Sequence, residues 1–469
     1  MYKIFCRKNT VYFFFSPLLI IILLFTSCEN TQKRQIASEP FSGDLMQYEL
    51  VLRRGRDRDW EEDVLEFAMN LINNHPLLLR NRITYSVNSF RRGFDYDPIW
   101  ELRARDYSRD KEFYEPFSSK IKEILWKIPI LDDYEIYYGL AEASSILSDL
   151  HTRITYPTVK IFPFQFSTFS DGIFTRRVLI SDERALGAEL IAINYVPVAK
   201  IVQIMGSIFP VENEYVLSRW APWSLINKSE ALLYTGIINS TADIPFTFLD
   251  TYGEEFTFFS DILVHGAEED TDRFLVNYDL SSPIEANYWF EYFPESDMIH
   301  VRFNSSYDIE GYPFTQFSDE VFHVIRENNG IETLVFDVRG NMGGLILSGV
   351  RQFISNLIDE REIIGSILVL IDENTYSAGV ITAGFLKKYV DDVILIGIPT
   401  SHGPNFFAGI HTFTLPNSGI SYTVSTRFNE SWPGFEGYNL MPDIYVPNTI
   451  DKNHFQAIME VITSQVLRK

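Results

Sequence analysis

The pattern of apolar and polar positions divides the chain into regions of different texture, and the first is helical. Apolar residues recur at helical spacing from about Asp59 to Ile72, and similar patterns cover residues 109–127 and 132–150. The first run stops at the Asn-Asn-His-Pro segment at 73–76, which is typical of a helix end. Residues 58–155 are therefore predicted to form an N-terminal helical domain.

The middle region is predicted to be rich in β-structure. Short runs of β-branched and aromatic residues occur at 177–180, 190–193 and 246–249. A helical pattern over about 209–238 interrupts them. We therefore expect a β-rich domain over residues 156–265 that carries a helical insertion.

The last 200 residues alternate strand and helix patterns. Continuous apolar runs at 333–338, 366–371 and 393–396 alternate with helical patterns near 345–357 and 377–389. Buried strands joined through helices indicate a largely parallel sheet with right-handed crossovers. In such sheets, functional sites gather at the carboxyl ends of the strands. We expect residues 266–469 to form an α/β core with its site in the loops that follow the first two strands.

The N-terminus carries the pattern of an export signal. A basic start (Lys3, Arg7, Lys8) precedes an apolar run over 11–25, and the run closes on Leu-Phe-Thr-Ser before Cys28. This resembles a bacterial lipoprotein signal, in which the cysteine is lipidated. Residues 1–27 are thus predicted to be a signal peptide and 28–57 a polar tether. We expect the mature chain to be anchored to a membrane of the bacterial cell envelope, facing the periplasm or the exterior; an uncleaved signal anchor is the alternative.

Composition and charge exclude several other classes of protein. The chain has 40 basic and 63 acidic residues, a net charge of −23, which disfavours nucleic acid as a partner. Its two cysteines, Cys6 and Cys28, cannot build a disulfide scaffold or a thiolate zinc cluster. The eight histidines are scattered without the His-Glu-x-x-His spacing, so no metal is predicted. The glycine-rich loop at 339–344 lacks the spacing of a nucleotide site, and no cofactor is expected.

The loop that ends at Ser377 could support acyl transfer. Ser377 precedes a predicted helix, so the N–H of Ala378 is unpaired and the helix dipole favours negative charge there. A nucleophile in this position, with a glycine N–H nearby, has the layout that acyl transfer needs. On spacing alone, the commoner use of such a serine is to cap the helix.

Five segments resemble, in order, motifs of the tail-specific (C-terminal processing) serine peptidases, whose clan includes the tricorn protease core. They are Asp-Val-Arg-Gly-Asn-Met-Gly-Gly at 337–344, Thr-Tyr-Ser-Ala at 375–378, Gly-Ile-Pro-Thr at 397–400, Leu-Pro-Asn-Ser-Gly at 415–419 and Pro-Asp-Ile at 442–444. Residues 186–198 resemble the middle of a PDZ domain, with Tyr195 in place of a glycine. The resemblance implies a core of the crotonase/Clp-protease-like type, a PDZ-like domain and a polypeptide substrate.

The resemblance also implies roles for individual residues. Ser377 would be the nucleophile, with the backbone N–H groups of Gly344 and Ala378 forming the oxyanion hole. In the tricorn-like branch, the base is a histidine in a segment similar to Leu-Ser-Asp-Leu-His-Thr at 147–152, which here gives His151. A glutamate late in the chain then orients the imidazole, and Glu436 is the candidate.

The identity of the base leaves an alternative open. The other branch of the family uses a lysine about 25 residues after the serine, but the segment 399–407 contains no lysine. His402 stands at that offset and is the rival base. The tricorn-like site also has a serine beside the histidine. Leu150 occupies that position, so the role is vacant or passes to Ser148.

Further positions depart from the family pattern or are expected to be structural. Val380 and Ile398 stand where the family usually has glutamates. Asp337 and Arg339 are expected to pair and shape the glycine-rich loop. The departures leave open a second function, that of a catalytically inactive relative that binds peptides or apolar ligands.

Overall fold

The structure is a computed structural model. It describes residues 45, 55–78, 82–87, 100–105, 111–155, 160–264, 273–276, 286–345, 347–435 and 437–466. The predicted signal peptide, Cys28, nearly all of the tether and Glu436 lie outside the described residues. Within the described ranges, no helix has both the length and the apolar character needed to cross a bilayer.

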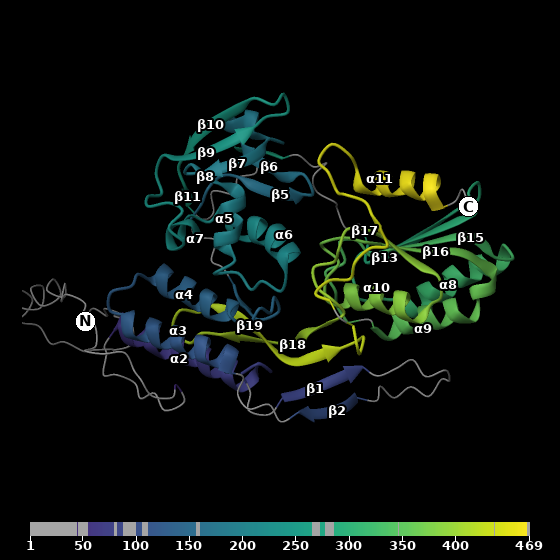
Figure 1. Cartoon of the computed structure of the whole chain (residues 1–469), viewed down its shortest axis with the longest axis horizontal. Helices are drawn as coiled ribbons and strands as arrows, with labels where there is room; N and C mark the ends of the chain where they lie inside the picture. The colour runs from purple at the N-terminus through teal and green to yellow at the C-terminus, as the bar shows by residue number, and fades with distance from the viewer. Residues whose placement is uncertain are drawn as a thin grey trace, which may run out of the picture.

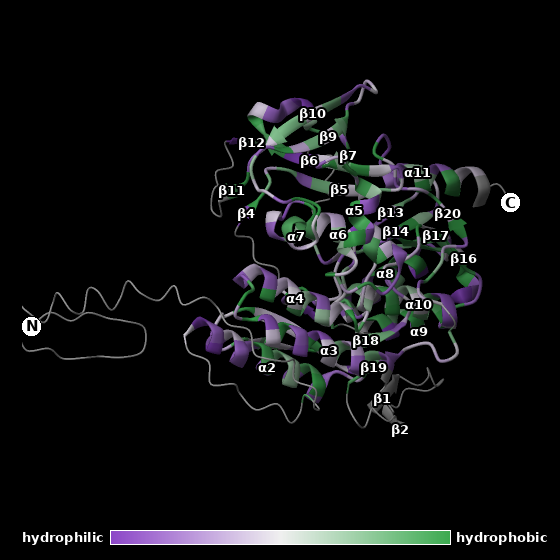
Figure 2. Cartoon of the chain, turned by 60° about the vertical axis from the view of Figure 1, so that its left-hand side comes forward, coloured by the Kyte–Doolittle hydropathy of each residue, from purple (hydrophilic) through white to green (hydrophobic). Residues whose placement is uncertain are grey.

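The three helices predicted for the N-terminal region are present. They are α2 (Arg56–Asn74), α3 (Lys111–Lys127) and α4 (Asp133–Ser145). Helix α4 begins with a capping box between Asp132 and Glu135, in which each side chain accepts a backbone N–H of the other residue. Along α2 and α4, hydrophilic and hydrophobic residues alternate, as expected for helices that bury one face (Figure 2).

The N-terminal region also contains strands, which the sequence analysis did not predict. Strands β1 (Arg82–Val87) and β2 (Trp100–Arg105) form a hairpin between α2 and α3, and β3 (Arg153–Ile154) follows α4. Strands β18 (Asn405–Thr414) and β19 (Ser421–Glu430) complete this sheet, because β1 pairs with β19 in parallel and β3 pairs with it in antiparallel fashion. A long hairpin of the C-terminal region thus reaches the N-terminal helices (Figure 1).

The middle region is a mainly antiparallel sheet with helices. Its strands run in the order β10-β9-β7-β6-β12, with β5 and β8 paired to β6 and β7. The strands of this sheet are β5 (Gln165–Phe169), β6 (Gly172–Leu179), β7 (Glu189–Ile193), β8 (Val196–Pro197), β9 (Ile244–Leu249), β10 (Glu255–Ser260) and β12 (Phe274–Val276). Strands β4 (Lys160–Ile161) and β11 (Leu263–Val264) pair with each other in a separate two-stranded sheet. The helices are η2 (Ile180–Ala185), α5 (Val198–Met205), α6 (Glu214–Leu225) and α7 (Ser229–Tyr234). Helices α6 and α7 lie within residues 209–238, where the sequence showed a helical pattern.

A tight turn in this sheet explains why a glycine was expected at position 195. Ile193 and Val196 pair across a two-residue hairpin, in which Asn194 and Tyr195 have φ of 48° and 62°. Turns with two positive φ angles favour Asn-Gly. Tyr195 therefore adopts a backbone conformation that suits glycine, and its side chain is exposed.

The C-terminal region is the predicted α/β core. Its sheet runs β13-β14-β15-β16-β17-β20, and every neighbouring pair is parallel except β13–β14. The strands are β13 (Tyr288–Phe293), β14 (Met298–Phe303), β15 (Ile331–Asp337), β16 (Ile364–Ile371), β17 (Val393–Gly397) and β20 (Ile444–Tyr445). The helical segments are α8 (Phe314–Glu327), α9 (Leu347–Asp359), η6 (Arg361–Ile363), α10 (Ala378–Tyr389), α11 (His454–Val461) and η7 (Ile462–Val466). Helices α8, α9 and α10 pack on one face and α11 on the other (Figure 1).

Packing does not follow the predicted boundary at residue 155. One hydrophobic core joins Phe67 and Ile136 of the N-terminal helices with Phe162 and Phe246 of the β-rich region. Tyr376, beside the candidate nucleophile, belongs to the same core. The first two regions are therefore one packed unit, and it reaches the candidate site.

Candidate active site

The backbone of Ser377 is in an unusual conformation. Ser377 precedes α10, after the loop that follows β16, and it has φ 52° and ψ −120°. Positive φ is uncommon for residues other than glycine and is found at functional sites. The hydroxyl makes no capping hydrogen bond to the helix. Ser377 occupies the N-cap position without using its side chain as a cap.

The glycine-rich loop packs directly against this serine. A Cβ on Gly343 would lie 2.7 Å from Cβ of Ser377 and 2.9 Å from N of Ala378, so the close approach requires glycine. The N–H of Gly343 is used, because it donates to Oδ1 of Asn341 at 2.8 Å. Among the described residues, neither Gly344 nor Ala378 has an acceptor for its N–H. The two N–H groups without an acceptor therefore belong to the residues that directly follow Gly343 and Ser377 in the chain.

Asp337 and Arg339 shape this loop, as predicted. Arg339 donates to both oxygens of Asp337, at 2.9 and 2.7 Å, and Arg302 donates to Oδ1 at 2.7 Å. Burial alone would raise the pKa of the Asp337 carboxyl, but the two guanidinium groups outweigh it and hold that pKa well below its usual range.

His151 lies beside the nucleophile turn, in the loop after α4. Its ring is nearly parallel to those of Tyr376 and Phe406, with centroids 4.7 and 5.4 Å away. Its Nδ1 lies 2.8 Å from the hydroxyl of Tyr376, the residue before Ser377. Burial lowers the pKa of His151 to about 4, and the nearby Asp149 carboxylate opposes that shift. The imidazole is therefore neutral at physiological pH.

Asp149 is the carboxylate next to this imidazole. It accepts hydrogen bonds from Nε2 of His75 at 3.1 Å, Oγ1 of Thr152 at 2.6 Å and the N–H of His151 at 2.9 Å. Burial raises the pKa of Asp149, but the hydrogen bond and charge of His75 lead the effects that lower it below its usual value. Its Oδ1 is 3.8 Å from Nδ1 of His151. The negative charge favours a proton on Nδ1 and so leaves Nε2 as an acceptor.

His402 also reaches the nucleophile turn, but both of its ring nitrogens have partners. Nδ1 lies 2.6 Å from the carbonyl oxygen of Gly403, which accepts its proton. Nε2 then accepts the backbone N–H of Ser377 at 2.9 Å. Burial lowers the pKa of His402 to about 3. In this arrangement His402 holds the backbone of the nucleophile turn.

The other positions named in the sequence analysis have different surroundings in the structure. Tyr376, and not Ser148, is the partner of Nδ1 of His151, since Ser148 is exposed. Val380 and Ile398 are buried apolar residues, so the polar groups that the family carries there are absent. Glu436 lies outside the described residues, and its role stays a prediction.

Sequence reasoning missed four residues of this site. Asp149 and Tyr376 lie inside the motifs that identified His151 and Ser377, so closer attention to those segments would have found them. His75 lies in the Asn-Asn-His-Pro segment that ends the first helix. Glu212, whose Oε1 accepts the N–H of Leu150 at 2.8 Å, carried no signal in the sequence.

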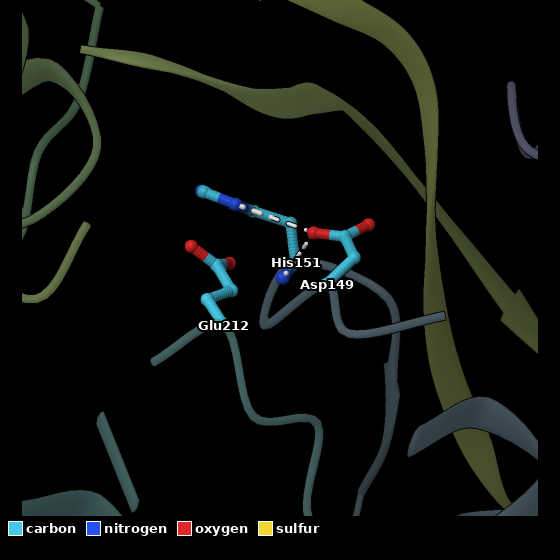
Figure 3. Close-up of side chains that lie close together, drawn as sticks. All are labelled: Asp149, His151 and Glu212. Carbon is cyan, nitrogen blue, oxygen red and sulfur yellow. Dashed lines mark hydrogen bonds and ion pairs between the residues drawn. The ribbon is translucent and has the colours of Figure 1, made fainter. Parts of the chain in front are cut away.

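Asp149, His151 and Glu212 form a cluster with the composition of a metal site. One donor atom from each lies within 4.8 Å of the other two, as Figure 3 shows. The hydrogen bonds described above already occupy these groups: Asp149 has three donors, and Nδ1 of His151 has Tyr376. We therefore do not identify these residues as metal ligands.

Comparison with known proteins supports the resemblance to a family of serine peptidases. The model of peptidase family S41 matches residues 355–446, a range that contains Ser377 and the motifs at 397–400, 415–419 and 442–444. This segment of the chain is similar to peptidase family S41. The chain is thus a serine-type peptidase, and the resemblance to tail-specific peptidases is confirmed at the level of the S41 match. A search of the curated proteins found no match.

Two solved structures of CPAF resemble the fold of this chain at low sequence identity. Mature CPAF aligns with a TM-score of 0.53 and 13% identity, covering 86% of this chain and 96% of that one. CPAF complexed with lactacystin aligns at 0.52 and 13%, covering 86% and 97%. The tricorn protease aligns at 0.29 and 13%, covering 78% of this chain and 38% of that one. The fold of this chain therefore resembles that of CPAF over most of both lengths.

Proposed function

We propose that this S41 peptidase is an active endopeptidase that cleaves polypeptides through an acyl-enzyme on Ser377. The single observation that carries the proposal is the nucleophile turn itself. Ser377 has a strained backbone and an uncapped hydroxyl, and Gly343 packs directly against it. The N–H groups of Gly344 and Ala378 have no acceptor among the described residues. A serine kept only as a helix cap would need none of these features.

His151 is the proposed base. Its neutral ring, the Nδ1 contact with Tyr376 and the adjacent Asp149 charge support the tautomer that accepts a proton on Nε2. His151 would take the proton of Ser377 and later give it to the leaving amine. His402 is assigned to positioning, because its Nε2 already accepts the N–H of Ser377. Glu436 keeps its proposed role as a carboxylate that orients the imidazole.

The setting of this activity is also proposed. Lipidation at Cys28 would anchor the enzyme in the cell envelope, outside the cytoplasm. The β-rich region would act as a PDZ-like domain that binds an extended segment of the substrate along a sheet edge. Its glycine-type turn at Asn194–Tyr195 supports this reading.

Hydrolysis of an unfolded protein such as casein tests the proposal. Ser377→Ala should abolish it, and His151→Ala should fall nearly as far, because members of such a site act as a unit. His402→Ala should keep more activity than His151→Ala. If the folded parent binds casein without cleaving it, the protein is a catalytically inactive binding protein. The apolar residues Val380 and Ile398 would then be the sequence features that distinguish it from active relatives.

A further inference from the structure

A second carboxyl group approaches the candidate base from a different part of the chain. Glu212 lies between α5 and α6, in the β-rich region, whereas Asp149 and His151 follow α4. Its side chain points toward His151, as Figure 3 shows. A carboxyl oxygen of Glu212, one of Asp149 and a ring nitrogen of His151 all lie within 4.8 Å of one another.

Specific contacts fix the segment that carries Glu212. The side chain of Asn213 caps α6 by accepting the N–H of Val216 at 3.0 Å, and its amide donates to the carbonyl oxygens of Ser401 and Tyr438. Farther along α6, Nε of Arg219 lies 3.4 Å from Oε1 of Glu373, in the nucleophile loop. Helix α6 is thus attached to the loops of both Ser377 and His402.

Glu212 also holds the backbone of the histidine loop. Its Oε1 accepts the N–H of Leu150 at 2.8 Å, while Asp149 accepts the next N–H, that of His151. Two carboxyl groups therefore satisfy two successive N–H donors, and the direction of the His151 side chain depends on both.

We propose that Glu212 is a positioning residue for His151: it fixes the loop backbone and, once ionised, stabilises the imidazolium that forms when Ser377 gives up its proton. Glu212 exchanges no proton with the substrate. The proposal rests on the proposed function, since it needs His151 to act as the base. It gives the β-rich region a direct part in catalysis.

The charged and titratable groups around Glu212 bear on the pH at which it ionises. They are Asp149, His151 and Tyr376. The charge of Arg153 lowers the pKa of both His151 and Tyr376, and Glu214 is exposed on α6. Burial, followed by the Asp149 charge, raises the pKa of Glu212 to about 8. The pKa of Asp149 is lowered, that of His151 is about 4 and that of Tyr376 is raised well above 10. Of the four groups Asp149, His151, Glu212 and Tyr376, Glu212 alone changes charge between pH 7 and pH 9.

The test is the pH dependence of kcat for peptide hydrolysis, with Glu212→Gln compared with the parent. The parent's kcat should rise roughly five- to tenfold from pH 7 to pH 9, because an opposite charge within about 4–6 Å shifts an imidazole by about one pKa unit or more. Glutamine keeps an acceptor for Leu150 but never ionises, so Glu212→Gln should lose the rise and keep the melting temperature. Glu214→Gln, two residues away and exposed, is the matched control and should keep the parent's profile.

The possible failures are distinguishable. A parent that hydrolyses peptide but has the same pH profile as Glu212→Gln would overturn the role of Glu212 alone. A folded parent with no hydrolysis at any pH would overturn the proposed function and this inference together. A purely structural Glu212 would lower the melting temperature of Glu212→Ala and leave the rise intact in Glu212→Gln.

Discussion

At the scale of single residues, a phenol completes the candidate site. The hydroxyl of Tyr376 lies 2.8 Å from Nδ1 of His151, whereas the sequence analysis left the role of the serine beside the histidine vacant or assigned it to Ser148. The motif identified Ser377, but its variable second position carried no expectation. Contacts between side chains from distant segments, here 225 residues apart, do not follow from local sequence. The same reason explains why Glu212 was missed.

Tyr376→Phe tests this contact. The variant removes one hydrogen bond to the base and keeps the ring that packs against His151. A neutral hydrogen bond contributes about 0.5–1.5 kcal/mol, so kcat should fall roughly three- to tenfold. Tyr445→Phe, at an exposed tyrosine, is the control and should match the parent. An unchanged kcat in Tyr376→Phe would show that the phenol does not orient His151.

Because His151 is buried, kcat/KM should fall only at an unusually low pH. Its pKa is lowered to about 4 from the ordinary value near 6.5, chiefly by burial. Because the neutral imidazole is the base, kcat/KM should hold down to about pH 4 and be lost below it. A pH profile of kcat/KM for a peptide checks this. A limb near pH 6.5 would mean that the free enzyme exposes the histidine to solvent.

At the scale of elements, the sequence predicted the α/β core well and the N-terminal sheet not at all. The parallel strands β15, β16 and β17 are continuous apolar runs, which is what burial on both faces produces. The pairing of β1 with β19 joins segments more than 300 residues apart. No local pattern encodes such a pairing, so the N-terminal region was predicted to be helical throughout.

One buried carboxylate fixes the tip of the β18–β19 hairpin to α2. Asp63 accepts the N–H and the side-chain amide of Asn417, at 2.9 and 3.0 Å, and the N–H of Ser418 at 2.7 Å. Asp63→Ala should therefore lower the free energy of unfolding by about 2 kcal/mol, measured by urea denaturation. Asp59→Ala, at an exposed position of the same helix, should change it by less than about 0.5 kcal/mol. Equal losses of unfolding free energy in the two variants would show that the contact with the hairpin tip is not the cause.

At the scale of the whole molecule, the anchor remains to be tested. Removal of residues 1–27 takes away three basic residues and no acidic one, which changes the net charge from −23 to −26. A chain this acidic gains no attraction from anionic lipid headgroups. Cys28→Ser should consequently move the protein from the membrane fraction to the soluble fraction with its fold unchanged by circular dichroism. Unchanged membrane association, with no lipid found by mass spectrometry, would refute lipidation.

The S41 match of residues 355–446, the CPAF-like fold and the geometry at Ser377 support one central proposal, that Ser377 is an activated nucleophile with His151 as its base. Labelling with a fluorophosphonate probe, followed by mass spectrometry of the adduct, tests it most directly. The account predicts one adduct, on Ser377, that is lost in Ser377→Ala, strongly slowed in His151→Ala and retained in His402→Ala. Labelling that persists in folded His151→Ala but disappears in folded His402→Ala, or a folded parent that does not react at all, would contradict it.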